Sequence, residues 1–455
     1  MASATGKSGI AVIRLSGLGC ISLASRVCFN GKLRDSTPRL AQVVNLEIDG
    51  IIDQVVVITY QQNKSFTGEE SLEIQCHGNH VLISIIIEAC INGGARMANP
   101  GEFSERAYLH GKIDLAQAEA IVDLIHATTK RNLIACTRSL QGELSKFCKI
   151  LKNSILDIFV EAEAHIDFSN EDIEIVSCET LASKSQSVSH ELTTFIERCN
   201  YGKLITEGLH IAIAGKPNAG KSSLFNALVG EGTAIVSEMP GTTRDILKEQ
   251  IAIAQIPITL YDTAGLRSSI DTIELIGQER AKQLFSRVDR IAYITKLDYS
   301  CKNKEDLEQM LESDKELAAI KLRLGDCPID FIFTGSDLYP SEQKSVLLSD
   351  GSQAIILSTL IHDTLGTLLH HWESVVQNQQ HSDNEFSARA RHIQCLTKSR
   401  DHLNQAACYF SGTSENIVLA CEELRMSLQA ISELVGETTN DELLGKIFST
   451  FCIGK

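Results

Sequence analysis

Hydrophobic and polar positions follow three successive patterns along this 455-residue chain. Up to about residue 116, short β-rich runs such as Ile10–Leu15 and Val55–Tyr60 are separated by glycine-bearing turns. One helical pattern, Val81–Ile91, lies among them. Strands mixed with a helix in this way predict an α+β domain.

From Leu115 onward the hydrophobic period becomes helical. Ile121, Leu124 and Ile125 repeat at i, i+3 and i+4, and a second stripe at i, i+4 and i+7 is formed by Leu140, Leu144 and Phe147. We expect helices up to about Tyr201, with one interruption at the acidic loop Asp167–Glu174.

The segment from His210 to about Trp372 alternates strands with helices, as a doubly wound parallel sheet requires. A helical stripe then returns, made of Leu424, Leu428, Ile431, Leu434 and Val435. Helices on both sides of an α/β block are typical of a domain inserted into another. We therefore predict an α+β domain over 1–116, a discontinuous helical domain over 117–206 and 372–455, and an inserted α/β domain over 207–371.

Composition indicates the class of protein and the compartment in which we expect it. Apolar residues make up 43% and charged residues 22%, which is typical of globular proteins. The longest apolar run, Val81–Ile87, is far too short to span a membrane, so we expect no transmembrane helix. The 14 cysteines include no CxxC pair, and we see no export signal, so we expect reduced thiols in the cytoplasm.

The formal net charge of −16 limits the choice of partners. Proteins that grip nucleic acid over a wide surface usually carry a basic face that displaces counterions. The acidic balance therefore argues against tight autonomous RNA binding. It leaves room for a basic patch or for a partner that holds the RNA.

The segment Gly215–Ser222 reads GKPNAGKS and lies between a short apolar strand, Ile211–Ala214, and a helical start, Lys221–Leu228. This is the context of a Walker A phosphate loop. Backbone N–H groups of such a loop and the helix N-terminus hold the phosphates. Lys221 is expected to pair with the β- and γ-phosphates, and the Ser222 hydroxyl with Mg²⁺.

Two further motifs follow in the order that a GTPase requires. Thr243, in the loop Gly241–Asp245, can complete the Mg²⁺ shell and sense the γ-phosphate. The motif Asp262-Thr263-Ala264-Gly265 follows the strand Ile258–Tyr261, and there Asp262 can hold the Mg²⁺ water shell and the Gly265 N–H can contact the γ-phosphate. Leu266 stands where many GTPases have a water-orienting glutamine, so another group must orient water or hydrolysis is slow. Glu274 and Glu279 lie downstream, although most such glutamates belong to a solvated helix face.

The base-reading motif departs from the usual Asn-Lys-x-Asp. After the strand Ile329–Phe333 the chain reads Thr334-Gly335-Ser336-Asp337, and a later loop begins at Ser358. Asp337 can accept hydrogen bonds from guanine, whereas the asparagine and lysine are replaced. Each lost contact costs about 1 kcal/mol, which predicts weakened guanine affinity or selectivity.

Several segments resemble the tRNA-modification GTPases that act on the wobble uridine, the MnmE or TrmE family. They are SFTGEESLEIQCHG (65–78), NPGEFSERAYLHGKIDLAQAEA (99–120), GKPNAGKSSLFNAL, PGTTRD, DTAGLR, IELIGQERA and ELLGKIFSTFCIGK (442–455). The resemblance covers essentially the whole chain and implies three parts. These are an α+β folate-binding domain, a discontinuous helical domain with a terminal CIGK motif, and an inserted α/β Ras-like G domain.

For the G domain, the resemblance implies a homodimer whose G domains associate on binding GTP and K⁺. Glu274 would orient the attacking water, and Asn218 would bind K⁺, although a turn residue after Pro217 explains Asn218 equally well. The loop that completes the K⁺ shell would contribute Ser237, Met239 and Thr242. The implied nucleotide contacts are Asn218, Ala219, Gly220, Lys221, Ser222, Ser223, Ser237, Glu238, Met239, Pro240, Gly241, Thr242, Thr243, Asp262, Thr263, Ala264, Gly265, Thr334, Asp337 and Ser358.

For the other parts, the resemblance implies a 5-formyl- or methylene-tetrahydrofolate site at Arg14, Glu73, Lys112 and Lys455. The folate would supply the one-carbon unit for a (carboxymethyl)aminomethyl group at C5 of U34. An FAD-dependent partner of the MnmG (GidA) type would supply the redox chemistry, hold most of the tRNA and form a heterotetramer with this chain. Cys452, near the chain end, is a candidate for the modification centre.

Two other functions remain open from the sequence. A ribosome-assembly GTPase of the Era type would need a KH-like domain, but no GXXG loop in a basic βα context follows the G domain. A nucleotide-binding scaffold with weak hydrolysis is favoured modestly by the altered base-reading loop. The hydrolytic candidates Lys221, Ser222, Thr243, Asp262 and Glu274 argue against it.

Overall fold

The structure is a computed structural model. It describes residues 1–3, 6–33, 37–167, 176–231, 248–262, 288–298, 303–324, 327–338, 345–358, 362–377, 385–411, 416–437, 441–449 and 451. The chain divides into two compact units, 1–125 with 139–193 and 394–455, and 126–138 with 194–393. Each unit is described by itself, and the predicted domain boundaries stay predictions.

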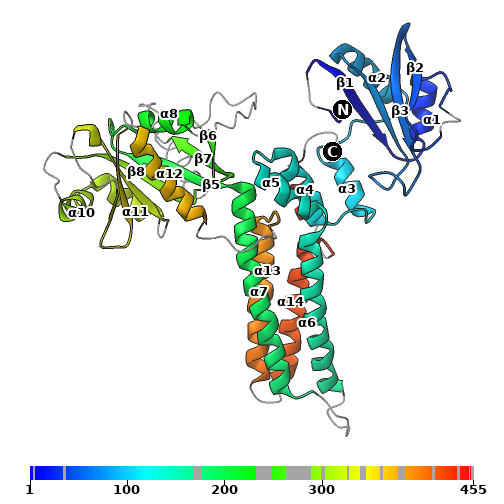
Figure 1. The fold of residues 1–455 in the computed structure, drawn as a ribbon. Coiled ribbons are helices and arrows are strands. Elements are labelled where there is room, and N and C mark those ends of the chain that lie inside the picture. Colours follow the sequence, from blue (N-terminus) through cyan, green and yellow to red (C-terminus); the bar gives the residue numbers. More distant parts are fainter. Residues whose placement is uncertain are drawn as a thin grey trace, which may run out of the picture. The chain divides into compact units, whose positions relative to one another are not determined.

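The amino-terminal part of the first unit contains a four-stranded antiparallel sheet, in which Figure 1 labels β1, β2 and β3. Its strand order is β1-β4-β3-β2. The strands are β1 (Ser8–Ser16), β2 (Gln42–Ile48), β3 (Ile51–Tyr60) and β4 (Ser71–Gly78). Helices α1 (Cys20–Cys28) and α2 (His80–Asn92) pack on it. Alternate strand residues such as Leu72, Ile74 and Leu46 are fully buried against them, as the period of two requires.

The rest of the first unit is helical. Its elements include α3 (Glu102–Leu109), α4 (Leu115–His126), α6 (Glu143–Asp167), α14 (Ile417–Val435) and α15 (Asp441–Ser449). Helix α6 packs along α14. A small core joins α4 and α15 through Leu115, Val122, Ile447 and Phe448, and Phe451 packs into it.

The unit boundaries also fall within the helices α5 (Lys130–Leu140), α7 (Cys178–Glu207) and α13 (Ala390–Phe410), and His126 at the end of α4 already belongs to the second unit. The prediction that Leu140, Leu144 and Phe147 lie on one helix was wrong. Helix α5 ends at Leu140 and α6 begins at Glu143, because Gly142 adopts a φ of 82°, a left-handed conformation that ends helices. Helix α7 continues past the predicted end at Tyr201.

The second unit contains a seven-stranded sheet with the order β10-β11-β9-β8-β5-β7-β6. Its strands are β5 (Leu209–Gly215), β6 (Lys248–Ile253), β7 (Ile256–Asp262), β8 (Arg290–Lys296), β9 (Ile329–Thr334), β10 (Ser345–Leu347) and β11 (Gln353–Leu357). The five strands from β11 to β7 are parallel, and the outer strands β6 and β10 are antiparallel. This confirms the predicted α/β domain.

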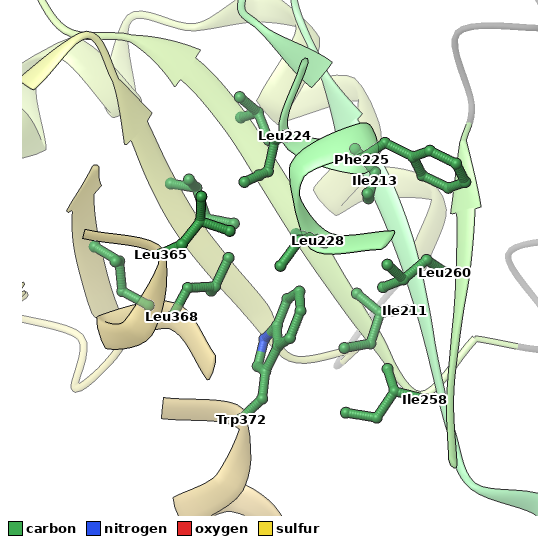
Figure 2. Close-up of a cluster of buried hydrophobic side chains, with 14 of the residues drawn as sticks. Ile211, Ile213, Leu224, Phe225, Leu228, Ile258, Leu260, Leu365, Leu368 and Trp372 are labelled. Carbon is green, nitrogen blue, oxygen red and sulfur yellow. The ribbon is translucent and has the colours of Figure 1, made fainter. Parts of the chain in front are cut away.

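Helices pack on this sheet around two apolar clusters. They are α8 (Lys221–Glu231), α10 (Lys304–Glu312), α11 (Lys315–Leu324) and α12 (His362–Gln377). Figure 2 shows Leu224 and Leu228 of α8 and Trp372 of α12 meeting over the central strands. Trp372, the only tryptophan of the chain, is fully buried there.

Candidate functional site

The phosphate loop leaves the central strand β5 at Gly215, which has a φ of 139°. A Cβ at this position would lie 1.9 Å from the backbone oxygen of Ile294 in β8. Only glycine therefore allows the loop to pass so close to the neighbouring strand. The strand–loop–helix context predicted for Gly215–Ser222 is confirmed.

Lys221 begins helix α8, and its side chain folds back over the loop. Its Nζ donates to the backbone oxygens of Gly215, at 2.7 Å, and Lys216, at 2.6 Å. The ammonium group is thus held at the start of the loop, where a phosphate chain would meet it. Ser222 and Ser223 follow in the first helical turn and are exposed.

Asp262 lies at the carboxyl end of β7, opposite Ile213 of β5 in the sheet register. Asp262 is buried, with only 3% of its surface exposed. The carboxyl ends of parallel strands share one edge of the sheet, which is where ligands bind in such folds. Asp262 and Ser222 therefore belong to the same edge, as a Mg²⁺ site requires.

Asn218 has a φ of 60° and is exposed, while Ala219 after it is buried. Asparagine is one of the few residues that adopt this left-handed conformation readily. The turn interpretation of Asn218 therefore has local support, and its K⁺ role stays a prediction.

The residues predicted to read the base lie at the same edge of the sheet. Thr334 ends β9, Asp337 is exposed in the short 3₁₀ helix Ser336–Leu338, and Ser358 follows β11. The Ser358 loop is fastened to α12, because the Ser358 N–H donates to Thr364 Oγ1 and that hydroxyl donates to the Ser358 oxygen. Phosphate and base motifs thus converge on one edge of the sheet.

In the amino-terminal sheet, Arg14 of β1 and Glu73 of β4 face each other in register. Arg14 Nε donates to Glu73 Oε1 at 2.7 Å. Both line a cavity of about 240 Å³, and the other lining residues are Leu15, Tyr60, Ser65, Phe66, Thr67, Ser71, Leu72 and Phe103. Lys112 Nζ donates to the backbone oxygen of Asn63, at the start of the loop that lines this cavity. The structure thus pairs Arg14 with Glu73 and anchors Lys112 on the loop beside their cavity.

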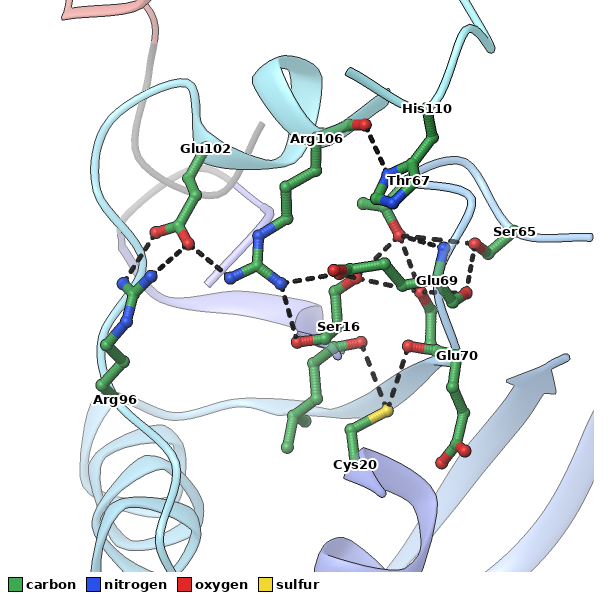
Figure 3. A network of polar contacts seen from close by, with 12 residues as sticks. Ser16, Cys20, Ser65, Thr67, Glu69, Glu70, Arg96, Glu102, Arg106 and His110 are labelled. Carbon is green, nitrogen blue, oxygen red and sulfur yellow. Dashed lines mark hydrogen bonds and ion pairs between the residues drawn. The ribbon is translucent and has the colours of Figure 1, made fainter. Parts of the chain in front are cut away.

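A partly buried polar network joins this sheet to α3 (Figure 3). Glu102 accepts hydrogen bonds from Arg96 and Arg106, and Arg106 also donates to Glu69, which accepts from Ser16. Hydrogen bonds from Arg96, from the Asn99 N–H and from Arg106 outweigh burial and lower the pKa of Glu102 to about 2. Glu102 therefore stays ionised as the centre of the network.

Comparison with known proteins matches both parts of the chain. Residues 115–452 match the model of the MnmE helical domain, and residues 1–112 match that of the GTP-binding protein TrmE N-terminus. The chain belongs to the MnmE (TrmE) family of tRNA modification GTPases. It is therefore a GTPase, and the predicted multidomain fold class is confirmed. The match over the full length favours this family over the Era-type alternative.

Three relatives illustrate the similarity, each named tRNA modification GTPase MnmE. That of Ectopseudomonas mendocina is 37% identical over 461 residues, covering 100% of this chain and 98% of the relative. That of Haemophilus influenzae (strain Rd) is 38% identical over 457 residues, and that of Nitrosospira multiformis is 37% identical over 459 residues, with the same coverage.

Several predicted site residues of the family lie outside the described residues, and their roles stay predictions. They are Ser237, Glu238, Met239, Pro240, Gly241, Thr242, Thr243, Thr263, Ala264, Gly265, Glu274, Cys452 and Lys455. Among the described helices, none is both long enough and apolar enough to cross a bilayer.

Sequence reasoning missed an anchor of the phosphate loop. Lys216 Nζ lies 3.1 Å from Asp314 Oδ2, and Asp314 also accepts a hydrogen bond from the buried Tyr293 hydroxyl. Burial alone would raise the pKa of Asp314, but hydrogen bonds from Tyr293, Lys216 and two backbone N–H groups lower it. No local signal indicates this anchor, because Asp314 lies almost 100 residues from the loop.

Proposed function

We propose that this GTPase is stimulated by K⁺ and acts in modification of the tRNA wobble uridine. With an FAD-dependent partner of the MnmG type, it would add a (carboxymethyl)aminomethyl group at C5 of U34. The one-carbon unit would come from a tetrahydrofolate derivative. The observation that supports this most is the coexistence, in one chain of this family, of a preorganised phosphate loop and an Arg14–Glu73 cavity.

The described part of the G domain contains residues that nucleotide hydrolysis requires. Lys221 is held over the loop carbonyls, so little reorganisation is needed when it meets phosphate oxygens. Asp262 and the Ser222 hydroxyl would hold Mg²⁺, which neutralises charge on the phosphates. Hydrolysis requires this Mg²⁺–phosphate set, and its presence among the described residues supports an enzyme over a degenerate scaffold.

Turnover of GTP in K⁺ and in Na⁺ buffers, with the full-length protein, tests the cation mechanism. We expect faster hydrolysis in K⁺, and a lower K⁺ response in Asn218→Ala. Equal rates in both cations would refute the K⁺ mechanism. ATP competing as well as GTP would refute guanine selectivity, and XTP measures how much base reading depends on Asp337.

The cavity beside Arg14 and Glu73 fits a folate by its chemistry. A carboxylate can accept paired N–H donors of a pterin edge, and Tyr60, Phe66 and Phe103 offer flat apolar walls. Lys112, close by, suits the anionic glutamate tail. The residues therefore suit recognition of a flat, N–H-rich ring with an anionic tail.

Binding of 5-formyltetrahydrofolate, measured by calorimetry, tests this assignment. Glu73→Gln should weaken binding by about tenfold or more, since hydrogen bonds to a charged group are worth about 1.5–3 kcal/mol. Asp53→Asn is a matched control, because Asp53 pairs with His77 on the same sheet at 2.8 Å and does not line the cavity. Equal losses in both variants would point to a general effect on the sheet.

The proposed partners are a second copy of this chain, the flavoprotein and tRNA. The net charge of −16 supports a division in which the flavoprotein holds most of the tRNA. The described cysteines are all free thiols, which supports a cytoplasmic setting. Sedimentation of the chain with and without GTP and K⁺ tests the homodimer, and mixing with the flavoprotein tests the heterotetramer.

A further inference from the structure

Thr334, the residue that replaces the usual base-reading asparagine, contacts the phosphate loop. Its Oγ1 donates to the backbone oxygen of Ala219 at 2.7 Å and lies 3.4 Å from the backbone oxygen of Thr295. The residue is 7% exposed, and a Cβ at Gly220 would lie 3.6 Å from its side chain. Thr334 therefore packs directly under the Ala219–Gly220 peptide.

We propose that Thr334 is a positioning residue that braces the phosphate loop through this peptide. The described peptide bonds are all trans, so the Ala219 C=O and the Gly220 N–H point in opposite directions. Holding the C=O against β9 directs the Gly220 N–H away from β9. In a loop of this kind the backbone N–H groups are the phosphate ligands. Thr334 thereby fixes one of these donors.

The same bond changes what this residue does for the base. A threonine hydroxyl has a single proton, and the 2.7 Å contact uses it on Ala219. Thr334 therefore acts on the triphosphate, which all nucleotides share, while Asp337 remains for guanine. The inference rests on GTP binding by this site.

A ligand that has phosphates but no base distinguishes a role of Thr334 in phosphate binding from a role in base recognition. We would measure the affinity of Mg²⁺-tripolyphosphate by competition with a fluorescent GTP analogue, together with the affinities of GTP and XTP. Thr334→Val keeps the shape and removes the donor, and Thr334→Ser restores the donor. Thr259→Val is the matched control, because Thr259 is also a buried strand residue, 2% exposed, in the interior of β7.

We expect Thr334→Val to weaken the binding of tripolyphosphate, GTP and XTP alike. Each Kd should rise by about fivefold, which is the equivalent of one neutral hydrogen bond. Thr334→Ser should return all three to within about twofold of the parent protein, and Thr259→Val should match the parent. If only GTP binding weakens, Thr334 reads the base, and the proposal that it positions the phosphate loop is refuted. Unchanged tripolyphosphate binding, or a Ser variant as weak as the Val variant, also refutes it.

Folding of each variant is checked by the fluorescence of Trp372, which lies in the core of the same unit. Should Thr334→Val fail to fold, Thr334→Cys against Thr334→Ser makes the same comparison, since a thiol is a weak donor of similar size. Failure of the parent protein to bind GTP would refute the function itself. Equal binding by the parent and donor-deficient variants would refute only the brace.

Discussion

Asp330 forms a buried charge cluster at the amino-terminal end of β9, and removing its charge should destabilise the second unit. Its carboxylate accepts from Arg290 Nη2 at 2.6 Å and from Trp372 Nε1 at 3.1 Å, and His371 Nε2 lies 2.9 Å away. The side chain of Asp330 is 2% exposed, and that of Arg290 is 17% exposed. Asp330→Asn keeps the shape and leaves the Arg290 guanidinium without a counter-charge.

The size of the effect follows from these contacts. Removing one partner of a buried ion pair costs about 3–5 kcal/mol, and the retained amide oxygen, which can still accept one hydrogen bond, brings the expected loss to about 2–4 kcal/mol. Glu373→Gln is the control on the same helix. Its partner His370 has an 82% exposed side chain, so the loss should stay below about 0.5 kcal/mol.

Urea unfolding followed by tryptophan fluorescence is the assay. Trp372 is the only tryptophan, so its emission reports on the second unit even when the first unit unfolds separately. A loss below about 1 kcal/mol in Asp330→Asn would refute the view that this carboxylate neutralises a buried guanidinium. A loss as large in Glu373→Gln would show that the helix, not the charge, is responsible.

The pH dependence gives a second check. Burial alone would raise the pKa of Asp330, but hydrogen bonds from Arg290 and His371 outweigh it and hold the pKa well below its ordinary value. A lowered folded-state pKa contributes stability above the unfolded value, and this stability is lost as the pH falls. The difference in free energy of unfolding between the parent protein and Asp330→Asn should therefore become smaller below about pH 4.

Three further predictions concern the other contacts. Glu102→Gln should lower the free energy of unfolding of the amino-terminal sheet by about 2 kcal/mol at pH 7, and the loss should shrink between about pH 4 and pH 2, measured by circular dichroism in urea. Asp314→Asn should release Lys216 and raise the Kd for GTP by about two- to fivefold, measured by fluorescent-nucleotide titration, whereas an unchanged Kd would contradict the anchor. Phe448→Ala should cost about 3 kcal/mol by leaving a cavity between α4 and α15, and a loss below about 1 kcal/mol would contradict close packing there.

Sequence reasoning succeeded where the signal is local. The loop Gly215–Ser222 could be placed between a strand and a helix because glycine spacing, strand hydrophobicity and helical period agree within about 20 residues. The break at Gly142 was missed, since Leu140, Leu144 and Phe147 match one helical stripe and a lone glycine is often tolerated within a helix.

Contacts between distant segments could not be predicted in the same way. The spacing of Glu102 and Arg106 is visible in the sequence, but their link to Glu69 depends on how a loop packs against α3. Thr334 looked like a lost base contact, and only the fold shows that its hydroxyl reaches Ala219, 115 residues away. Family resemblance supplied Arg14 and Glu73, which composition and period would have left as surface residues.

The packing of α15 against α4 has a consequence for the order of folding during synthesis. The core of the amino-terminal sheet uses only residues from the first 95 positions and can form early. Leu115 and Val122, in contrast, must wait for Ile447 and Phe448, and α6 must wait for α14. A ribosome releasing residues one by one thus leaves these apolar helix faces uncovered until it has made nearly all of the described chain. Over that interval they are exposed to aggregation or to chaperones.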